Sequence, residues 1–449
     1  MVTLVDSSLI AGYLVVVLVI GYVSGRKQTS GDFMIAERKL GLFAFVSTVV
    51  ASSIGGTILV VYSAYIYEFG VSALAGFAGF GAGMVAFMIT AKELRKKAHE
   101  MNFHTMADFF IHKIGRGAGL LVGAVISVMI ISAILKQFIA GTVILSAVSG
   151  WGYELSLLIS AAVVLVYLVL GGFASVVKTD IFQYLILILF MAVIATGAVT
   201  ESHLSFADIT AAEGSPTLAL SFFVYGFLSI WFLNEIWQRM YAAASDAVVR
   251  RGLLISGAFM LAIGVGITLI ALSVRATTPG LDPSQTIVYG MTSLVPPQLL
   301  AFGIVLLFAA IMSTMDTFIF MLATNIVKDG AVNLRGKRLS ERDLVRWTRA
   351  SIIIIIFAAT GLAYVFRDII DVALITVGLG MSVVPSIAAS LRAKPAQASV
   401  VASIAAGLAA TAGFVLAGVV TPESMVAVVL VSAAALGATE LWVRQKVVT

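Results

Sequence analysis

The hydrophobic residues of this chain are gathered into long runs that short polar segments separate. Most runs have about 20 residues, the length at which an α-helix crosses the hydrocarbon core of a bilayer. The pattern therefore predicts thirteen membrane-spanning helices. They lie at about residues 7–25, 40–67, 71–91, 118–148, 152–172, 179–200, 217–238, 252–274, 297–327, 345–365, 370–391, 397–418 and 423–443.

The composition agrees with an all-α integral membrane protein. Of 449 residues, 60% are hydrophobic and 11% are charged, and the mean hydropathy is +1.07. Soluble domains have about 25% charged residues. The first apolar run has no basic segment before it, and Arg26 and Lys27 follow it, so we expect no cleavable signal peptide. We expect one transmembrane domain over 1–449, whose partners are a lipid bilayer and a small organic solute. No nucleic acid or obligate protein partner is indicated.

The distribution of basic residues predicts the orientation. Loops on one side of the predicted spans have 25 of the 28 Lys and Arg residues, including Arg239. The other side has Arg275 and Arg367, and Lys136 lies within a span. Basic loops stay in the cytoplasm. We therefore expect a multi-pass protein of the plasma (inner) membrane, with its N-terminus outside and its C-terminus cytoplasmic.

The ninth predicted span has several oxygen-bearing side chains at its centre. Ser313, Thr314, Asp316 and Thr317 lie within five residues. Ala310, Ser313 and Thr314 share one helix face, and Ser313, Asp316 and Thr317 share another. A carboxylate at this depth is costly unless it serves an ion or a polar partner. The segment predicts a cation site, and hence an ion-coupled transporter.

The second predicted span has a point at which its helix is expected to open. Ser52 and Ser53 precede Ile54, and Gly55 and Gly56 follow it. Paired glycines favour local unwinding, and the carbonyls that unwinding frees need a ligand or a neighbour. Broken helices of this kind bind substrate and coupling ions in many transporters. The alternative is that the small residues only allow close helix packing.

Four stretches of the chain match a known family pattern in order. They are Ser24-Gly25-Arg26 with Asp32-Phe33 and residues 37–41; residues 171–180 with Gln183; Gln238-Arg239 with Ala242-Ala243; and residues 309–317. Together they resemble the sodium/solute symporter family, which includes sodium/proline, sodium/sialic acid and sodium/glucose cotransporters. The resemblance covers roughly residues 7–395.

This resemblance implies a LeuT-like fold with two inverted repeats of five helices. Repeat one would occupy 39–200 and repeat two 217–391. One extra helix with its loop would precede them at 7–38, and two extra C-terminal helices would follow at 396–444.

The resemblance also implies a Na⁺ site between the second and ninth spans. Its ligands would be the backbone carbonyls of Ala51, Ile54 and Ala310, with the hydroxyls of Ser313 and Thr314. For Ser313 and Thr314 the alternative is a hydrogen bond to a carbonyl of their own helix.

Some relatives bind a second Na⁺, and the matching residues are Asp180, Ser313, Asp316 and Thr317. Asp316 departs from the serine of those relatives. Either its carboxylate strengthens the second site, or it neutralises a nearby cation and no second ion binds. Asp180 could instead cap its helix after Thr179.

Lys136 is the only basic residue expected to be buried within a predicted span, and a lone ammonium there needs an anion. Three interpretations remain open. Lys136 contacts an anionic solute, it pairs with Asp316 or Asp180, or it extends to an interface. If Lys136 pairs with Asp316, it could also stand in for a cation, and coupling would then be partly proton-linked.

The solute is expected to bind between the broken helices. Candidate residues are Ser52, Ser53, Gly56, Thr57, Lys136, Gln137, Trp231 and Asn234, with Glu235 beside them. Gly226 and the polar residues 234–238 suggest where the seventh span opens. Trp231 is equally consistent with a packing role, and Glu235 with a pair to Arg239.

We therefore expect a Na⁺-coupled symporter that imports a small organic solute, a carboxylate or an amino acid. The alternatives are a non-transporting solute sensor, a symporter of a neutral sugar or polyol, and partly proton-coupled transport. An enzyme is not expected, because the chain has four histidines, no cysteine and no nucleophile constellation within a span.

Overall fold

The computed structural model describes residues 4–25, 38–171, 176–189, 215–294, 300–334, 336, 339–366 and 369–448. Within these ranges the regular elements are helices, and Leu40 and Ala243 form an isolated bridge. The helices are α1 (Leu4–Gly25), α3 (Leu42–Ser53), η2 (Thr57–Val61), α4 (Tyr62–Phe69), η3 (Gly70–Ala73), α5 (Leu74–Glu100), α6 (Met106–Lys113), α7 (Arg116–Ser149), α8 (Tyr153–Gly171), α11 (Pro216–Phe232), α12 (Asn234–Ala242), α13 (Asp246–Thr277), η4 (Pro283–Gln285), α14 (Thr286–Leu294), α15 (Leu300–Asn325), η6 (Ile326–Leu334), α16 (Glu341–Val365), α17 (Ile369–Arg392), α18 (Gln397–Leu416) and α19 (Pro422–Val448). A further helix covers 176–189.

In the part of the chain that the structure describes, eight helices are long and apolar enough to cross a membrane. The number is nine if α11 and α12, which are bent by 46° at a short break, are counted as one span. Thirteen spans and their division into inverted repeats involve segments outside the described residues, so both stay predictions. The all-helical membrane architecture is confirmed.

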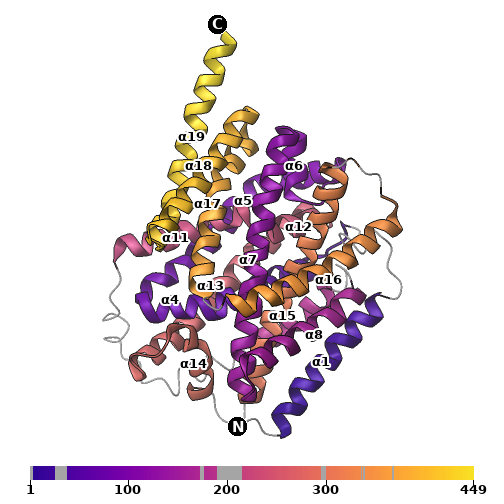
Figure 1. The fold of residues 1–449 in the computed structure, drawn as a ribbon, viewed down its shortest axis with the longest axis vertical. Helices are drawn as coiled ribbons and strands as arrows, with labels where there is room; N and C mark the ends of the chain where they lie inside the picture. The colour runs from indigo at the N-terminus through magenta and orange to yellow at the C-terminus, as the bar shows by residue number, and fades with distance from the viewer. Residues whose placement is uncertain are drawn as a thin grey trace.

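Helix α15 lies at the centre of the molecule. It packs against α7, α3, α1 and α16, and the whole of its apolar window is buried. On another side α5 packs between α11 and α13 (Figure 1). Helices α17, α18 and α19 lie side by side, and α19 extends beyond the other helices at its C-terminal end (Figure 1). The ninth predicted span is therefore the helix most enclosed by others, as an ion-binding helix needs to be.

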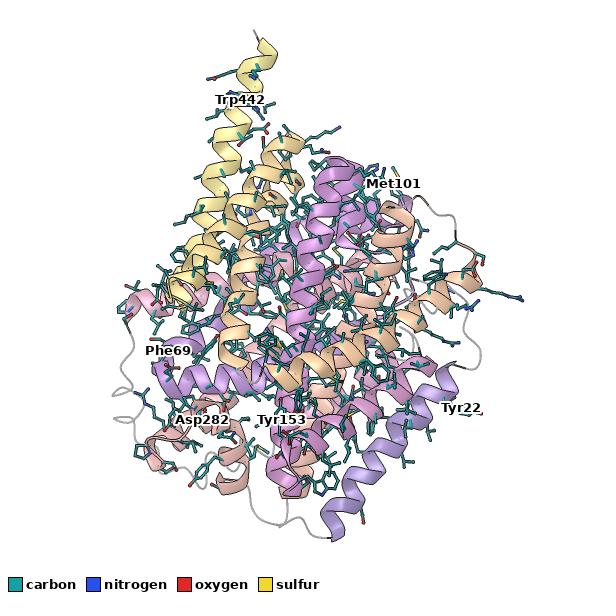
Figure 2. The ribbon with its side chains drawn as sticks, in the orientation of Figure 1. Tyr22, Phe69, Met101, Tyr153, Asp282 and Trp442 are labelled. Atoms are coloured by element: carbon teal, nitrogen blue, oxygen red, sulfur yellow. The ribbon has the colours of Figure 1, made fainter. Side chains whose placement is uncertain are left out.

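The outer faces of the helices have exposed apolar side chains. Ile89, Leu416 and Leu430 are each at least 70% exposed. Figure 2 shows Trp442 on the extended part of α19 and Tyr22 on the outer side of α1. A protein surrounded by water rarely exposes large apolar patches, so these faces are suited to lipid.

The predicted break in the second span is confirmed. Helix α3 ends at Ser53, Ile54 and Gly55 form a bend outside the helix, and the chain continues as the π-helix η2 and then as α4. Ile54 has φ −94° and ψ 81°, outside the helical region. The chain therefore turns out of its helix at the paired glycines.

The seventh span also breaks, but not at Gly226. That glycine lies within α11, and a Cβ there would be 2.0 Å from the carbonyl oxygen of Gly76 on α5. Gly226 thus allows two helix backbones to approach closely. The break comes at Leu233, which has an extended ψ of 102° between α11 and α12. The interpretation of Gly226 as an opening point is wrong, whereas the polar residues from 234 onward do begin at the break.

Candidate ion and solute site

The broken α3 meets α15 at a cluster of oxygens. The Thr314 hydroxyl lies 3.2 Å from the carbonyl oxygen of Ala310 in its own helix. It lies 3.5 Å from the carbonyl oxygen of Ala51 on α3. All three residues are buried, with Thr314 only 2% exposed. Two carbonyls and a hydroxyl, from helices more than 250 residues apart in sequence, therefore converge inside the protein.

The carbonyls at the end of α3 are left available by the break. Among the described residues, the carbonyl oxygens of Ala51 and Ile54 receive no backbone hydrogen bond. The C-terminal end of a helix has a partial negative charge from its unsatisfied carbonyls. Unwound carbonyls and such helix ends coordinate Na⁺ in transporters of this architecture. The donor set suits a hard monovalent cation.

Gly55 and Gly56 allow the close contact between α3, α7 and α15. A Cβ on Gly55 would be 2.4 Å from Thr314 Oγ1 and 2.7 Å from Gln137 Oε1. A Cβ on Gly56 would be 2.5 Å from Ala140 on α7. The Gly56 N–H donates to Gln137 Oε1 at 2.6 Å, so α7 satisfies one of the groups freed by unwinding.

The second set of predicted oxygens is gathered around an arginine. The Ser313 hydroxyl donates to Asp180 Oδ1 at 2.6 Å, and the Thr48 hydroxyl also donates to Asp180. Arg239 Nη2 donates to Thr317 Oγ1 at 2.9 Å and to Thr48 Oγ1 at 3.1 Å, and it lies 3.5 Å from Asp180 Oδ2. Asp180 therefore accepts from other helices, and the guanidinium already contacts several of these oxygens.

The structure corrects the predicted location of Arg239. The sequence places it among the cytoplasmic loop residues, but its side chain is 0% exposed. Asp316, also 0% exposed, acts on it electrostatically. The only signal was the match of Gln238-Arg239 to the family pattern, which says nothing about burial. A buried guanidinium is expensive unless it is paired and hydrogen-bonded, and here it is both.

Ser313 links the two oxygen sets. Its hydroxyl hydrogen is directed to Asp180, so the lone pairs of its oxygen stay free to bind a cation. Thr314, the next residue, points to α3 instead. The alternative was a hydrogen bond from each hydroxyl to a carbonyl of its own helix. Thr314 makes such a bond to Ala310, in addition to its contact with α3. Among the described residues, Ser313 makes none.

A cavity of about 110 Å³ lies next to the ion-site residues, since Thr314 lines both. It brings together most of the predicted solute residues: Ser52 and Ser53 from α3, Lys136 and Gln137 from α7, and Asn234 from α12. The rest of its wall is largely apolar and includes Ile58, Tyr62, Phe80, Met129, Tyr225 and Phe318. Sequence reasoning missed these residues, because an apolar side chain in an apolar span gives no signal of a cavity.

Trp231 and Gly56 are not among the described residues that line the cavity. The Trp231 ring packs edge-to-face on Phe87, with centroids 5.1 Å apart, and its carbonyl accepts from the Trp237 indole. Gly56 instead contributes its N–H to Gln137. The Thr57 side chain lies outside the described part of the structure.

Two opposite charges line the cavity. Lys136 is 5% exposed and Glu235 is 4% exposed. They act on one another electrostatically, but among the described residues no direct ion pair joins them, and Lys136 has no recorded hydrogen bond. Asp180, one of the anions considered for Lys136, pairs with Arg239 instead.

Gln137 presents an unused donor at the same place. Its Oε1 accepts from Gly56, while its buried Nε2 has no hydrogen-bond partner among the described residues. A buried donor without a partner costs about 1–3 kcal/mol. A solute that offers an acceptor oxygen would remove that cost.

The chain is similar to known Na⁺-coupled symporters. The sequence profile of the sodium:solute symporter family matches residues 33–387. Sodium/proline symporter 2 of Staphylococcus saprophyticus is 25% identical over 384 residues, which cover 80% of this chain and 75% of that protein. The sodium/proline symporter of Staphylococcus aureus strain Newman is 24% identical over 390 residues, covering 81% and 76%.

Two solved structures have a similar fold. One is a substrate-bound, outward-open Na⁺-coupled sialic acid symporter, with a TM-score of 0.83 and 14% identity over 98% of each chain. The other is a transporter of the nucleobase-cation-symport-1 family in a closed conformation, with a TM-score of 0.62 and 12% identity over 94% of this chain and 97% of that one. At these identities the likeness concerns the fold alone.

Proposed function

The chain belongs to the sodium:solute symporter family, and on this premise we propose that it imports a small organic solute bearing a carboxylate, an amino acid included, together with Na⁺. The observation that carries the proposal is the convergence of Ala51, Ala310 and Thr314 oxygens at a helix break beside a cavity. Thr314 lines both sites, so ion and solute binding are in a position to influence one another. The sodium/proline relatives support Na⁺ coupling.

In this proposal Na⁺ is bound by the carbonyl oxygens of Ala51, Ile54 and Ala310 and by the hydroxyls of Ser313 and Thr314. The ion replaces its hydration water with these oxygens and holds α3 against α15. External Na⁺ stabilises the outward-facing arrangement, solute binds beside it, and the pair is carried inward. Loss of the ion to a low internal Na⁺ concentration then loosens the solute site.

The available energy is adequate for accumulation. One Na⁺ that crosses 100 mV contributes about 2.3 kcal/mol. A tenfold concentration gradient adds about 1.4 kcal/mol. Together they support roughly several-hundredfold accumulation of a solute that has no net charge.

We further propose that one Na⁺ is transported per cycle. Arg239 supplies a positive charge to Asp180 and donates to the hydroxyls of Thr48 and Thr317. A second ion would need the oxygens of Asp180 and Thr317, and the guanidinium already contacts both residues. Arg239 thereby acts as a tethered cation in place of a second Na⁺.

The predicted membrane orientation belongs to the same proposal. The N-terminus faces outside, the C-terminus faces the cytoplasm, and residues 39–200 and 217–391 form the two inverted repeats. The paired breaks, one in α3–α4 and one between α11 and α12, are what two related repeats would each contribute.

Uptake into proteoliposomes tests the proposal. The purified chain should accumulate labelled L-proline or another small labelled amino acid only when an inward Na⁺ gradient is imposed, with an inward K⁺ gradient as the control. Accumulation that is independent of Na⁺ would refute the coupling. Na⁺-dependent solute binding without any uptake would refute transport and favour the solute sensor.

A further inference from the structure

Lys136 and Glu235 place one positive and one negative charge at the wall of the same cavity. They come from different helices: Lys136 from the middle of α7, and Glu235 from the first turn of α12, directly after the break at Leu233. Both side chains are at least nine-tenths buried. We propose that these two side chains bind the two poles of a zwitterion, so that the solute is a small α-amino acid. This inference rests on the proposed symport function and specifies its substrate class.

Burial makes the separated charges expensive. A charge taken out of water needs an opposite charge or several hydrogen bonds close by. Among the described residues Lys136 has neither a hydrogen bond nor a direct ion pair, although Glu235 acts on it electrostatically. A ligand that lies between the two side chains and is charged at both ends would provide the missing contacts.

The other solute classes fit this wall less well. A simple carboxylate would satisfy Lys136 but would bring a second anion close to Glu235, and like charges repel. A neutral sugar or polyol would bring no charged group into contact with either side chain. An amino acid offers a carboxylate to Lys136 and an ammonium to Glu235. The total charge of the occupied cavity is then unchanged.

The carboxylate pole has a second donor next to Lys136 in the sequence. Gln137 Nε2, which lacks a partner, is a further donor for a carboxylate oxygen.

The remaining wall is suited to a small apolar side chain. Ile126, Met129, Ile130 and Val377 line the same cavity. Binding sites for small molecules commonly have such an apolar lining with a few polar groups that fix orientation. The cavity volume of about 110 Å³ is large enough to admit a small solute.

The test compares solutes that differ in one charged group. Thermal stabilisation and competition for Na⁺-dependent uptake are measured on the full-length chain with three matched sets. These are L-alanine, propionate and ethylamine; L-valine, 3-methylbutanoate and isobutylamine; and L-proline, cyclopentanecarboxylate and pyrrolidine. In at least one set the amino acid should bind about tenfold or more tightly than both single-charge analogues.

Two variants test which side chain binds which charged end of the amino acid. Glu235→Gln should reduce the preference for the amino acid over the matching carboxylate by about tenfold or more. Lys136→Met should reduce the preference over the matching amine by a similar factor. Glu68→Gln, at an exposed position on α4, is the control and should leave both preferences unchanged.

The outcomes separate this inference from the proposed function. One outcome is that a single-charge analogue is taken up in a Na⁺-dependent manner, with an affinity equal to that of the amino acid and unaffected by Glu235→Gln. This result would contradict the proposal of a zwitterionic solute but would leave the proposed Na⁺ symport in place. Stabilisation by none of the three amino acids would also overturn it. If Na⁺ promotes the uptake of no solute in the panel, the proposed function falls as well.

Discussion

Thr314 offers the sharpest test of the ion site, because valine has nearly the same shape but lacks the hydroxyl. In the structure Thr314 Oγ1 lies 3.2 Å from the Ala310 carbonyl and 3.5 Å from that of Ala51. Thr314→Val removes one cation ligand and leaves the other four in place. Thr314→Ser keeps the oxygen and loses only a methyl group, so it is the matched control.

The size of the effect follows from burial and charge. Thr314 is 2% exposed, and the added methyl group of valine fills the space of the hydroxyl, so water cannot take its place. A polar contact to a charged group contributes about 1.5–3 kcal/mol. Since 1.4 kcal/mol is a factor of ten, the Na⁺ concentration for half-maximal uptake should rise about 10- to 150-fold.

The assay is the Na⁺ dependence of uptake into proteoliposomes at saturating solute. Thr314→Ser should stay within about threefold of the wild type, because its hydroxyl can still bind the ion. An unchanged Na⁺ requirement in Thr314→Val, in protein that folds and binds solute normally, would refute the assignment of this residue as a ligand.

Three further predictions concern other parts of the molecule. Gly55→Ala should abolish Na⁺-dependent uptake, since its Cβ would be 2.4 Å from Thr314 Oγ1, whereas Gly41→Ala, with no atom within 4 Å, should retain it. Arg239→Gln should raise the Hill coefficient for Na⁺ from about one towards two, whereas Arg239→Lys should not; equal coefficients would count against the tethered cation. Burial beside two basic groups lowers the pKa of His104 from 6.5 to about 4. The unfolded chain then binds a proton at His104 more readily than the folded chain does. The contribution of His104 to the free energy of unfolding should therefore be complete above about pH 6.5 and should decline towards pH 4. A series of thermal-unfolding measurements at different pH values would show this decline, and His104→Gln should flatten it.

The helix break and the oxygen-rich face of α15 could be predicted from the sequence because each has a local signal. Paired glycines that follow two serines mark the opening of α3, and the spacing of Ala310, Ser313 and Thr314 places them on one face. Such signals depend only on neighbours in the chain. The contact between Thr314 and Ala51 then follows from the packing of α15 on α3.

The burial of Arg239 and the pairing of its partners could not be predicted, because they depend on contacts between distant segments. From the sequence alone, an arginine near the end of a predicted span is assigned to the adjoining loop. Only tertiary packing brings Arg239 into contact with Asp180 and Thr48. Gly226 illustrates the same limit. A glycine in an apolar helix signals either a break or a close approach, and the position of α5 decides between them.

Direct binding of radioactive sodium to the purified chain tests the central claim, that Na⁺ binds where the broken α3 meets α15. We expect saturable binding of one Na⁺ per chain, retained in Thr314→Ser and lost or greatly weakened in Thr314→Val. The absence of saturable Na⁺ binding, or binding that Thr314→Val leaves unchanged, would contradict it.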